Sequence, residues 1–275
     1  MAEAGATIVF AHANGFPAGV YRLLFEAWRE AGCTVLAPPR LGHDPAYPVV
    51  SNWRPTCDEL LRFIDEGGID KPLHLVGHSM GGYVCLLAAC RRPAMAASVT
   101  LLDAPLVRGW RARTVRAMKL TGLMRRLGPG RVSQSRRMHW ESREAALAHF
   151  AAKRAFASWD PRMLADYIDC GTEPVPGCAG VRLVFQREVE TRIYETLPHH
   201  FDTLLRRHPP RCPVAYVGGT SSSEGRRAGL GGTRALVHER VQWIEGSHLF
   251  PMERPAATAA AVLRAIRAAA GLSAA

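Results

Sequence analysis

The chain has 275 residues, of which 48% are apolar and 21% charged, and its formal net charge is +11. This composition is typical of a globular protein with one sizeable core, and it excludes disordered, collagen-like and coiled-coil chains. No apolar run reaches the roughly 20 residues that a transmembrane helix needs. The seven cysteines form no C-x-x-C pair, so neither a disulfide scaffold nor a zinc ribbon is expected. We therefore expect a protein of the reducing cytoplasm.

Short apolar runs alternate with amphipathic stretches through the first third of the chain. The predicted strands there are residues 7–11, 34–37, 73–76 and 98–102, and the predicted helices are residues 21–31, 58–65 and 80–90. Strands resume at residues 213–217 and 241–245, and residues 256–270 form a last helix. Such alternation predicts an α/β fold, with a mostly parallel central sheet and helices on both of its faces.

Residues 106–211 interrupt this pattern and are mostly helical in character. They predict helices over residues 115–127 and 143–157 and one short strand over residues 181–185. A helical block between two strands of one sheet indicates an inserted cap over the carboxyl ends of the strands, where open α/β sheets bind ligands. We therefore divide the chain into a core of residues 1–105 and 212–275 and a helical cap of residues 106–211. The Ser/Gly-rich residues 218–232 are expected to form a flexible loop.

The excess of positive charge belongs to the predicted cap, which holds 20 Lys/Arg and 10 Asp/Glu residues. One interpretation is a solvated, arginine-rich helical surface, and the other is a field that attracts anionic substrates or a membrane surface. No nucleic-acid-binding motif is visible, so no nucleic-acid partner is expected. The cap also contains an apolar stripe, expected either to pack on the core or to contact an acyl chain, made of Leu120, Leu123, Met124 and Leu127.

The segment Gly77-His78-Ser79-Met80-Gly81 has the form G-x-S-x-G, directly after a predicted strand and before a predicted helix. Glycines are needed there because side chains beside the sharp strand-to-helix turn would collide with neighbouring backbone. His78 is expected to point back into the packing around the turn. Ser79 is left exposed at a helix N-terminus, where the helix dipole favours developing negative charge. We therefore predict Ser79 to be a nucleophile.

A serine hydroxyl needs an adjacent base, and histidine titrates near neutrality. His248 follows the last predicted strand and therefore lies at the same edge of the sheet as Ser79. The base needs an orienting acid, for which we favour Asp103 because it ends a strand, and keep Glu224 as the alternative. Both acids satisfy the order Ser, acid, His along the chain.

Two backbone amides are the predicted oxyanion donors: that of Met80, the residue after the nucleophile, and that of Phe16, in the turn after the first strand. The side chain of Asn14 is a further candidate donor. The sequence leaves the substrate-binding residues open.

Three segments resemble the α/β-hydrolase family, specifically its capped, esterase-like serine hydrolases. They are HANGFPAGVY as the oxyanion turn, GHSMGG as the nucleophile elbow and GSHLFPMERP as the histidine loop. The resemblance implies a cofactor-independent enzyme without a metal site, acting on a small-molecule ester or thioester. The basic charge and the apolar stripe of the predicted cap leave open a substrate that is anionic or carries an acyl chain. Many members place an Asp soon after the strand equivalent to residues 213–217, where this chain has Gly218-Gly219-Thr220. An acid at the end of the preceding core strand is known within the fold and matches Asp103.

The leading functional hypothesis is therefore cleavage of a carboxylic ester or thioester through an acyl-enzyme on Ser79. The same three residues could instead serve carbon–carbon bond hydrolysis, perhydrolysis or cofactor-free lyase chemistry. A non-catalytic ligand- or lipid-binding protein of the same fold is the third hypothesis. Substrate identity and oligomeric state are left open by the sequence.

Overall fold

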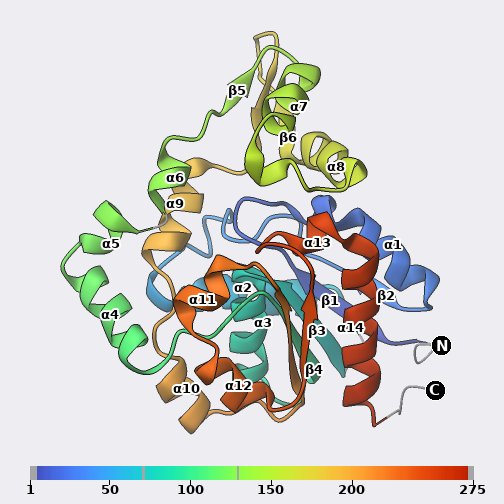
Figure 1. Cartoon of the computed structure of the whole chain (residues 1–275), viewed down its shortest axis with the longest axis vertical. Coiled ribbons are helices and arrows are strands. Elements are labelled where there is room, and N and C mark those ends of the chain that lie inside the picture. The colour runs from blue at the N-terminus through green and yellow to red at the C-terminus, as the bar shows by residue number, and fades with distance from the viewer. Residues whose placement is uncertain (1–4, 70–71, 129, 272–275) are drawn as a thin grey trace.

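A six-stranded parallel sheet with helices on both faces forms the centre of the computed structural model, which describes residues 5–69, 72–128 and 130–271 (Figure 1). This architecture confirms the predicted fold class. In sheet order the strands are β2 (Thr34–Leu36), β1 (Thr7–Ala11), β3 (Leu73–His78), β4 (Ala96–Leu102), β8 (Val214–Gly219) and β9 (Val241–Ile244).

Both faces of the sheet are covered, which explains why its strands are almost continuously apolar. Ile8 and Phe10 of β1 pack on one side with the cluster that includes α1 (Arg22–Glu30) and α14 (Pro255–Ala269). Val9 and Ala11 of the same strand point to the other side. That side carries α2 (Arg54–Glu66) and α3 (Met80–Arg91). The carboxyl ends of β3, β4 and β8 meet at one edge of the sheet, where the predicted functional residues follow.

The chain between β4 and β8 contains seven of the described α-helices and a second, antiparallel sheet of order β5-β7-β6. The helices are α4 (Gly109–Leu120), α5 (Leu123–Leu127), α6 (Gly130–Gln134), α7 (Arg143–Ala151), α8 (Pro161–Gly171), α9 (Arg187–Glu195) and α10 (Phe201–Arg207). The strands are β5 (His139–Trp140), β6 (Thr172–Pro174) and β7 (Val181–Leu183). Figure 1 shows α7, α8 and this small sheet beyond one end of the core, whereas α4 and α5 lie along its side.

Three local predictions were wrong. Residues 115–127 form two helices, because Gly122 has a φ of 72° and ends the helical path between α4 and α5. Residues 143–157 form α7 and then a short 3-10 helix (Arg154–Phe156). Residues 218–232 are largely ordered as the end of β8, as α11 (Ser223–Ala228) and as the start of α12 (Gly231–Val237).

The apolar stripe of the inserted region also differs from the expectation that it packs on the core. Met124 is buried, but Leu120, Leu123 and Leu127 are exposed. Helical spacing predicts which side chains share a face, and it does not predict what covers that face.

Hydrogen bonds tie the inserted region to the core at several points. The Trp53 indole donates to Thr196 Oγ1 (3.0 Å), and Lys119 Nζ donates to Ser51 Oγ (2.7 Å).

Among the described helices, none combines the length and the apolar character that a membrane crossing requires.

Candidate active site

The turn between β3 and α3 places Ser79 at its apex, with φ 53° and ψ −113°, a conformation that a non-glycine residue rarely adopts. Close packing explains the flanking glycines. A Cβ at Gly77 would lie 2.3 Å from the backbone of Gly81, and one at Gly81 would lie 2.0 Å from the carbonyl oxygen of Ala11. The backbone around Ser79 is therefore as tight as the G-x-S-x-G pattern predicted.

The structure brings Ser79, His248 and Asp103 together. His248 Nε2 lies 3.0 Å from Ser79 Oγ, and His248 Nδ1 lies 2.6 Å from Asp103 Oδ2. Because a carboxylate can only accept, Nδ1 carries the proton and donates to Asp103, which leaves Nε2 to accept from the Ser79 hydroxyl. In this arrangement Nε2 can take the proton of Ser79.

Asp103 is almost completely buried and directly follows β4. Its Oδ1 accepts from the amide of Gly219 (3.2 Å) and from the hydroxyl of Tyr216 (3.1 Å), and its Oδ2 accepts from Ser222 Oγ (2.5 Å). Burial acts to raise the pKa of Asp103, but the hydrogen bonds and the charge of His248 outweigh it and hold the pKa below its ordinary value. The carboxyl is therefore ionised at neutral pH.

Glu224, the alternative acid, lies beside the same imidazole but farther away. Its Oε2 is 3.9 Å from His248 Nδ1, and the side chain is partly exposed in the first turn of α11. Ser222 Oγ bridges the two acids, because it also lies 3.4 Å from Glu224 Oε2. The structure therefore gives the direct hydrogen bond to Asp103 and leaves Glu224 as a second negative charge near the ring.

The pKa of His248 is set by opposing effects. Burial acts to lower it, whereas the hydrogen bond and charge of Asp103 and the charge of Glu224 raise it, and the net result is a pKa above the ordinary value. The loop that carries His248 is fixed by Glu253, whose carboxylate accepts from the amide of Ser247 (2.9 Å) and from its hydroxyl.

His78 is fully buried behind Ser79, as the sequence indicated, and has two polar partners. Its Nε2 lies 2.9 Å from the carbonyl oxygen of His248, and its Nδ1 lies 2.7 Å from the hydroxyl of Tyr21. The carbonyl oxygen can only accept, so Nε2 is the donor and Nδ1 accepts from Tyr21. Burial lowers the pKa of His78 to about 3, which keeps the ring neutral.

Tyr21 extends this chain of hydrogen bonds to the turn after β1, because its oxygen accepts from the amide of Ala13 (3.3 Å). The oxyanion turn and the loop of His248 are thus connected through two buried side chains. Sequence reasoning missed this connection, since nothing in the spacing of Tyr21 and His78 indicates that they meet.

The predicted oxyanion donors come from the start of α3 and from the turn after β1. Met80 is the first residue of α3, and the first amides of a helix have no partner within the helix. The amide of Phe16 donates to the carbonyl oxygen of Ala13 (3.2 Å) and closes the turn. Asn14 uses its Nδ2 on the carbonyl oxygen of Glu190 in α9 (3.0 Å). Oxyanion roles for Met80, Phe16 and Asn14 stay predictions.

His12 also forms hydrogen bonds at the turn after β1. Its Nε2 accepts from the amide of Leu41 (2.7 Å), and its Nδ1 donates to the carbonyl oxygen of Ala13 (2.9 Å). Burial lowers the pKa of His12 to about 4, so the ring is neutral and can keep both bonds. His12 therefore stabilises the turn through these two hydrogen bonds.

A buried ion pair from the inserted region lies over the turn. Arg136 Nη1 is 2.9 Å from Glu190 Oε2, and a Cβ at Gly15 would lie 3.1 Å from that guanidinium nitrogen. Gly15 has a φ of 83° and no Cβ, which lets the turn approach the pair closely. Aromatic side chains also border the turn, because the ring of Phe16 lies 5.6 Å from the rings of both Trp159 and Tyr167. The turn is therefore bordered by one charged pair and by aromatic surface.

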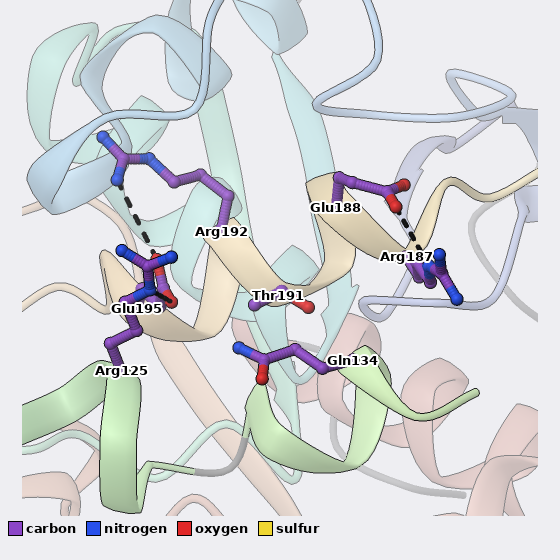
Figure 2. Close-up of a pocket in the computed structure, with 7 residues that line it drawn as sticks. All are labelled: Arg125, Gln134, Arg187, Glu188, Thr191, Arg192 and Glu195. Carbon is purple, nitrogen blue, oxygen red and sulfur yellow. Dashed lines mark hydrogen bonds and ion pairs between the residues drawn. The ribbon is translucent and has the colours of Figure 1, made fainter.

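A groove of about 500 Å³ opens elsewhere, between α5, α6 and α9, and Figure 2 shows its polar lining. Its charged side chains are largely paired: Arg187 lies 2.9 Å from Glu188, and Arg125 and Arg192 each lie 3.9 Å from Glu195. None of the residues that line it belongs to the set around Ser79. We therefore do not assign the groove to the chemistry of Ser79.

Known structures share this fold. E-2-(acetamidomethylene)succinate hydrolase is similar at 21% identity, with a TM-score of 0.72, over 97% of this chain and 92% of that one. A thioesterase domain from the curacin biosynthetic pathway has 20% identity and a TM-score of 0.72 over 94% and 91% of the two chains. A thermophilic esterase from Thermogutta terrifontis has 17% identity and a TM-score of 0.62 over 96% and 90%.

A search of curated proteins gives no match for the chain. The family model described as the alpha/beta hydrolase family, however, matches residues 8–261, which is nearly the whole sequence. With the parallel sheet and the inserted helical region, this match shows that the chain belongs to the alpha/beta hydrolase family.

Proposed function

We propose that the protein is a serine hydrolase that cleaves a carboxylic ester or thioester through an acyl-enzyme on Ser79. The observation that carries the proposal is the position of His248, whose two ring nitrogens bond Ser79 Oγ at 3.0 Å and Asp103 Oδ2 at 2.6 Å. A base oriented by a buried carboxylate and bonded to the hydroxyl of a partly exposed serine is the arrangement that activates that serine.

In the first step the oxygen of Ser79 forms a bond with the carbonyl carbon of the substrate, and its proton moves to His248 Nε2. The amide of Met80 stabilises the negative charge on the carbonyl oxygen. The amide of Phe16 also does so when its hydrogen, which bonds to the carbonyl oxygen of Ala13, bonds to the oxyanion as well. The bond to the leaving alcohol or thiol then breaks, and His248 returns the proton to that group. Water releases the acyl group by the same steps, with His248 again as the base.

Asp103 has the orienting role in this proposal, because it keeps the proton of His248 on Nδ1 and stabilises the imidazolium. Glu224 adds negative charge at longer range. The free cysteines accord with a reducing cytoplasmic location, which is also part of the proposal.

Kinetics on p-nitrophenyl esters graded by acyl length and charge test this function. We expect turnover by the wild type and its loss in Ser79→Ala and His248→Ala, whereas His139→Ala, which removes an exposed histidine on β5, should leave it unchanged. Diketones in the same panel test carbon–carbon bond hydrolysis. Turnover of diketones but of no ester or thioester would contradict the proposal.

A further inference from the structure

The outer surface of α4 and α5 exposes an unusual amount of apolar side chain. Trp110 is 64% exposed, Leu120 78% and Leu127 65%. With Leu123, this short segment carries four of the seven large apolar side chains that are exposed within the described residues. Figure 1 shows both helices at the outer edge of the molecule, away from the central sheet. We call the exposed residues of α4 and α5 the outer α4–α5 surface.

Helical geometry places the exposed apolar side chains of α4 on one face. Trp110, Arg113, Ala117 and Leu120 are separated by three, four and three residues, the spacing that aligns side chains along a helix, and all four are exposed. The opposite side of the helix is attached inward, because Lys119 Nζ donates to Ser51 Oγ of the core and also to the carbonyl oxygen of Leu197 in the inserted region (3.0 Å). The apolar face is therefore held outward by the fold.

The same surface is strongly basic. Between Gly109 and Leu127 the chain has six Lys/Arg residues and no Asp or Glu. Arg113, Arg116, Arg125 and Arg126 are exposed around the apolar side chains. The side chain of Arg125 is 81% exposed, and Glu195, the acid with which it forms an ion pair, lies 3.9 Å away. The guanidinium of Arg111 lies over the Trp110 ring at 4.6 Å.

We propose that the outer α4–α5 surface docks the protein on the surface of a bilayer that contains anionic phospholipids. Basic helices with exposed tryptophan and leucine lie in the plane of a membrane interface, where the apolar side chains enter the acyl boundary and the arginines meet lipid phosphates. A bilayer supplies both kinds of contact. The described helices include no membrane-crossing segment, so the attachment is peripheral and reversible.

Charge argues against the other occupants. A second copy of the chain would place four exposed arginines against four, so self-association through this surface is disfavoured. An acidic protein would pair the arginines, but it would also have to match four apolar side chains spread over two helices that change direction at Gly122. A fluid lipid surface adapts to that outline without a matching shape.

Sedimentation with vesicles tests the proposal. We expect the protein to bind vesicles of phosphatidylcholine and phosphatidylglycerol, to bind phosphatidylcholine alone much more weakly, and to be released by high salt. Arg113→Gln/Arg126→Gln should weaken binding by at least about tenfold. The matched control Arg254→Gln/Arg264→Gln removes two exposed arginines at the other end of the chain and should bind nearly as the wild type does.

The apolar contribution is tested in the same assay. Leu127→Ser should weaken binding several-fold, and Leu147→Ser, at a leucine 39% exposed on α7, should not. Ser79→Ala should bind vesicles as the wild type does, so failure of docking and failure of the proposed hydrolase activity are distinguishable. Absence of binding to anionic vesicles would overturn the proposal in favour of an acidic protein partner, and so would binding that the arginine variants leave unchanged.

Discussion

His78 donates a hydrogen bond from Nε2 to the carbonyl oxygen of His248 at 2.9 Å, so the residue before the nucleophile holds the loop of the proposed base. Its other nitrogen accepts from Tyr21, whose oxygen in turn accepts from the amide of Ala13. One line of buried hydrogen bonds therefore sets the distance between the oxyanion turn and the imidazole. Its role is to position both groups, because neither Tyr21 nor His78 bonds to Ser79.

Tyr21→Phe interrupts this line while keeping the ring. We predict that kcat falls about fivefold, since one buried hydrogen bond is worth roughly 1 kcal/mol, while KM changes little. Steady-state kinetics on the best ester of the panel measure the effect, with Tyr47→Phe, in a loop outside the site, as the control. An unchanged kcat in Tyr21→Phe would show that the line only stabilises the fold.

The two acids beside His248 predict unequal losses. Asp103→Asn removes the acceptor 2.6 Å from Nδ1 and should lower kcat by about 10³–10⁴-fold. Glu224→Gln removes a charge 3.9 Å away and should lower kcat by less than about tenfold. Rates of the two variants on one ester decide the assignment. A larger loss in Glu224→Gln than in Asp103→Asn would reverse the roles.

Glu224 also predicts a shift in the pH profile. His248 must be neutral to act as the base, and its pKa is raised above the ordinary value, with the charge of Glu224 among the causes. Activity should therefore fall as the pH drops through that raised pKa. Glu224→Gln lowers the pKa, so the acid limb of kcat/KM should move to lower pH. The same limb in both proteins would exclude an electrostatic effect of Glu224 on His248.

Buried neutral histidines predict acid lability. The pKa of His12 is lowered by burial to about 4, from 6.5 in the unfolded chain. The neutral ring contributes up to about 3 kcal/mol to the free energy of unfolding. This contribution is complete above pH 6.5 and is lost as the pH falls through about 4. Urea unfolding between pH 7 and pH 4 should show a shallower pH dependence of the unfolding free energy in His12→Gln than in the wild type. Parallel curves would contradict the buried neutral state of His12.

The sequence predicted the core sheet and the meeting of Ser79, His248 and Asp103, because each follows a recognisable strand and parallel strands end at one edge. It could not predict the bonds of Tyr216 and Ser222 to Asp103, or the Arg136–Glu190 pair over Gly15. Those contacts join residues far apart in the chain and follow from tertiary packing alone.

The inserted region was the least predictable part. Periodicity suggested one helix over residues 115–127, but the positive φ of Gly122 divides it. The apolar stripe there allows packing on the core or contact with an acyl chain, and the exposure of Leu120 and Leu127 contradicts only the first. Local pattern determines a helical face, whereas its covering depends on segments that the pattern does not describe.

Covalent labelling of the nucleophile tests the central claim most directly. We predict that an alkyl fluorophosphonate adds one phosphonyl group to the wild-type protein, that peptide mass spectrometry places it on Ser79, and that His248→Ala labels far more slowly. His139→Ala should label at the wild-type rate. An adduct on another residue, or no adduct on folded protein, would contradict the assignment of Ser79 as the nucleophile.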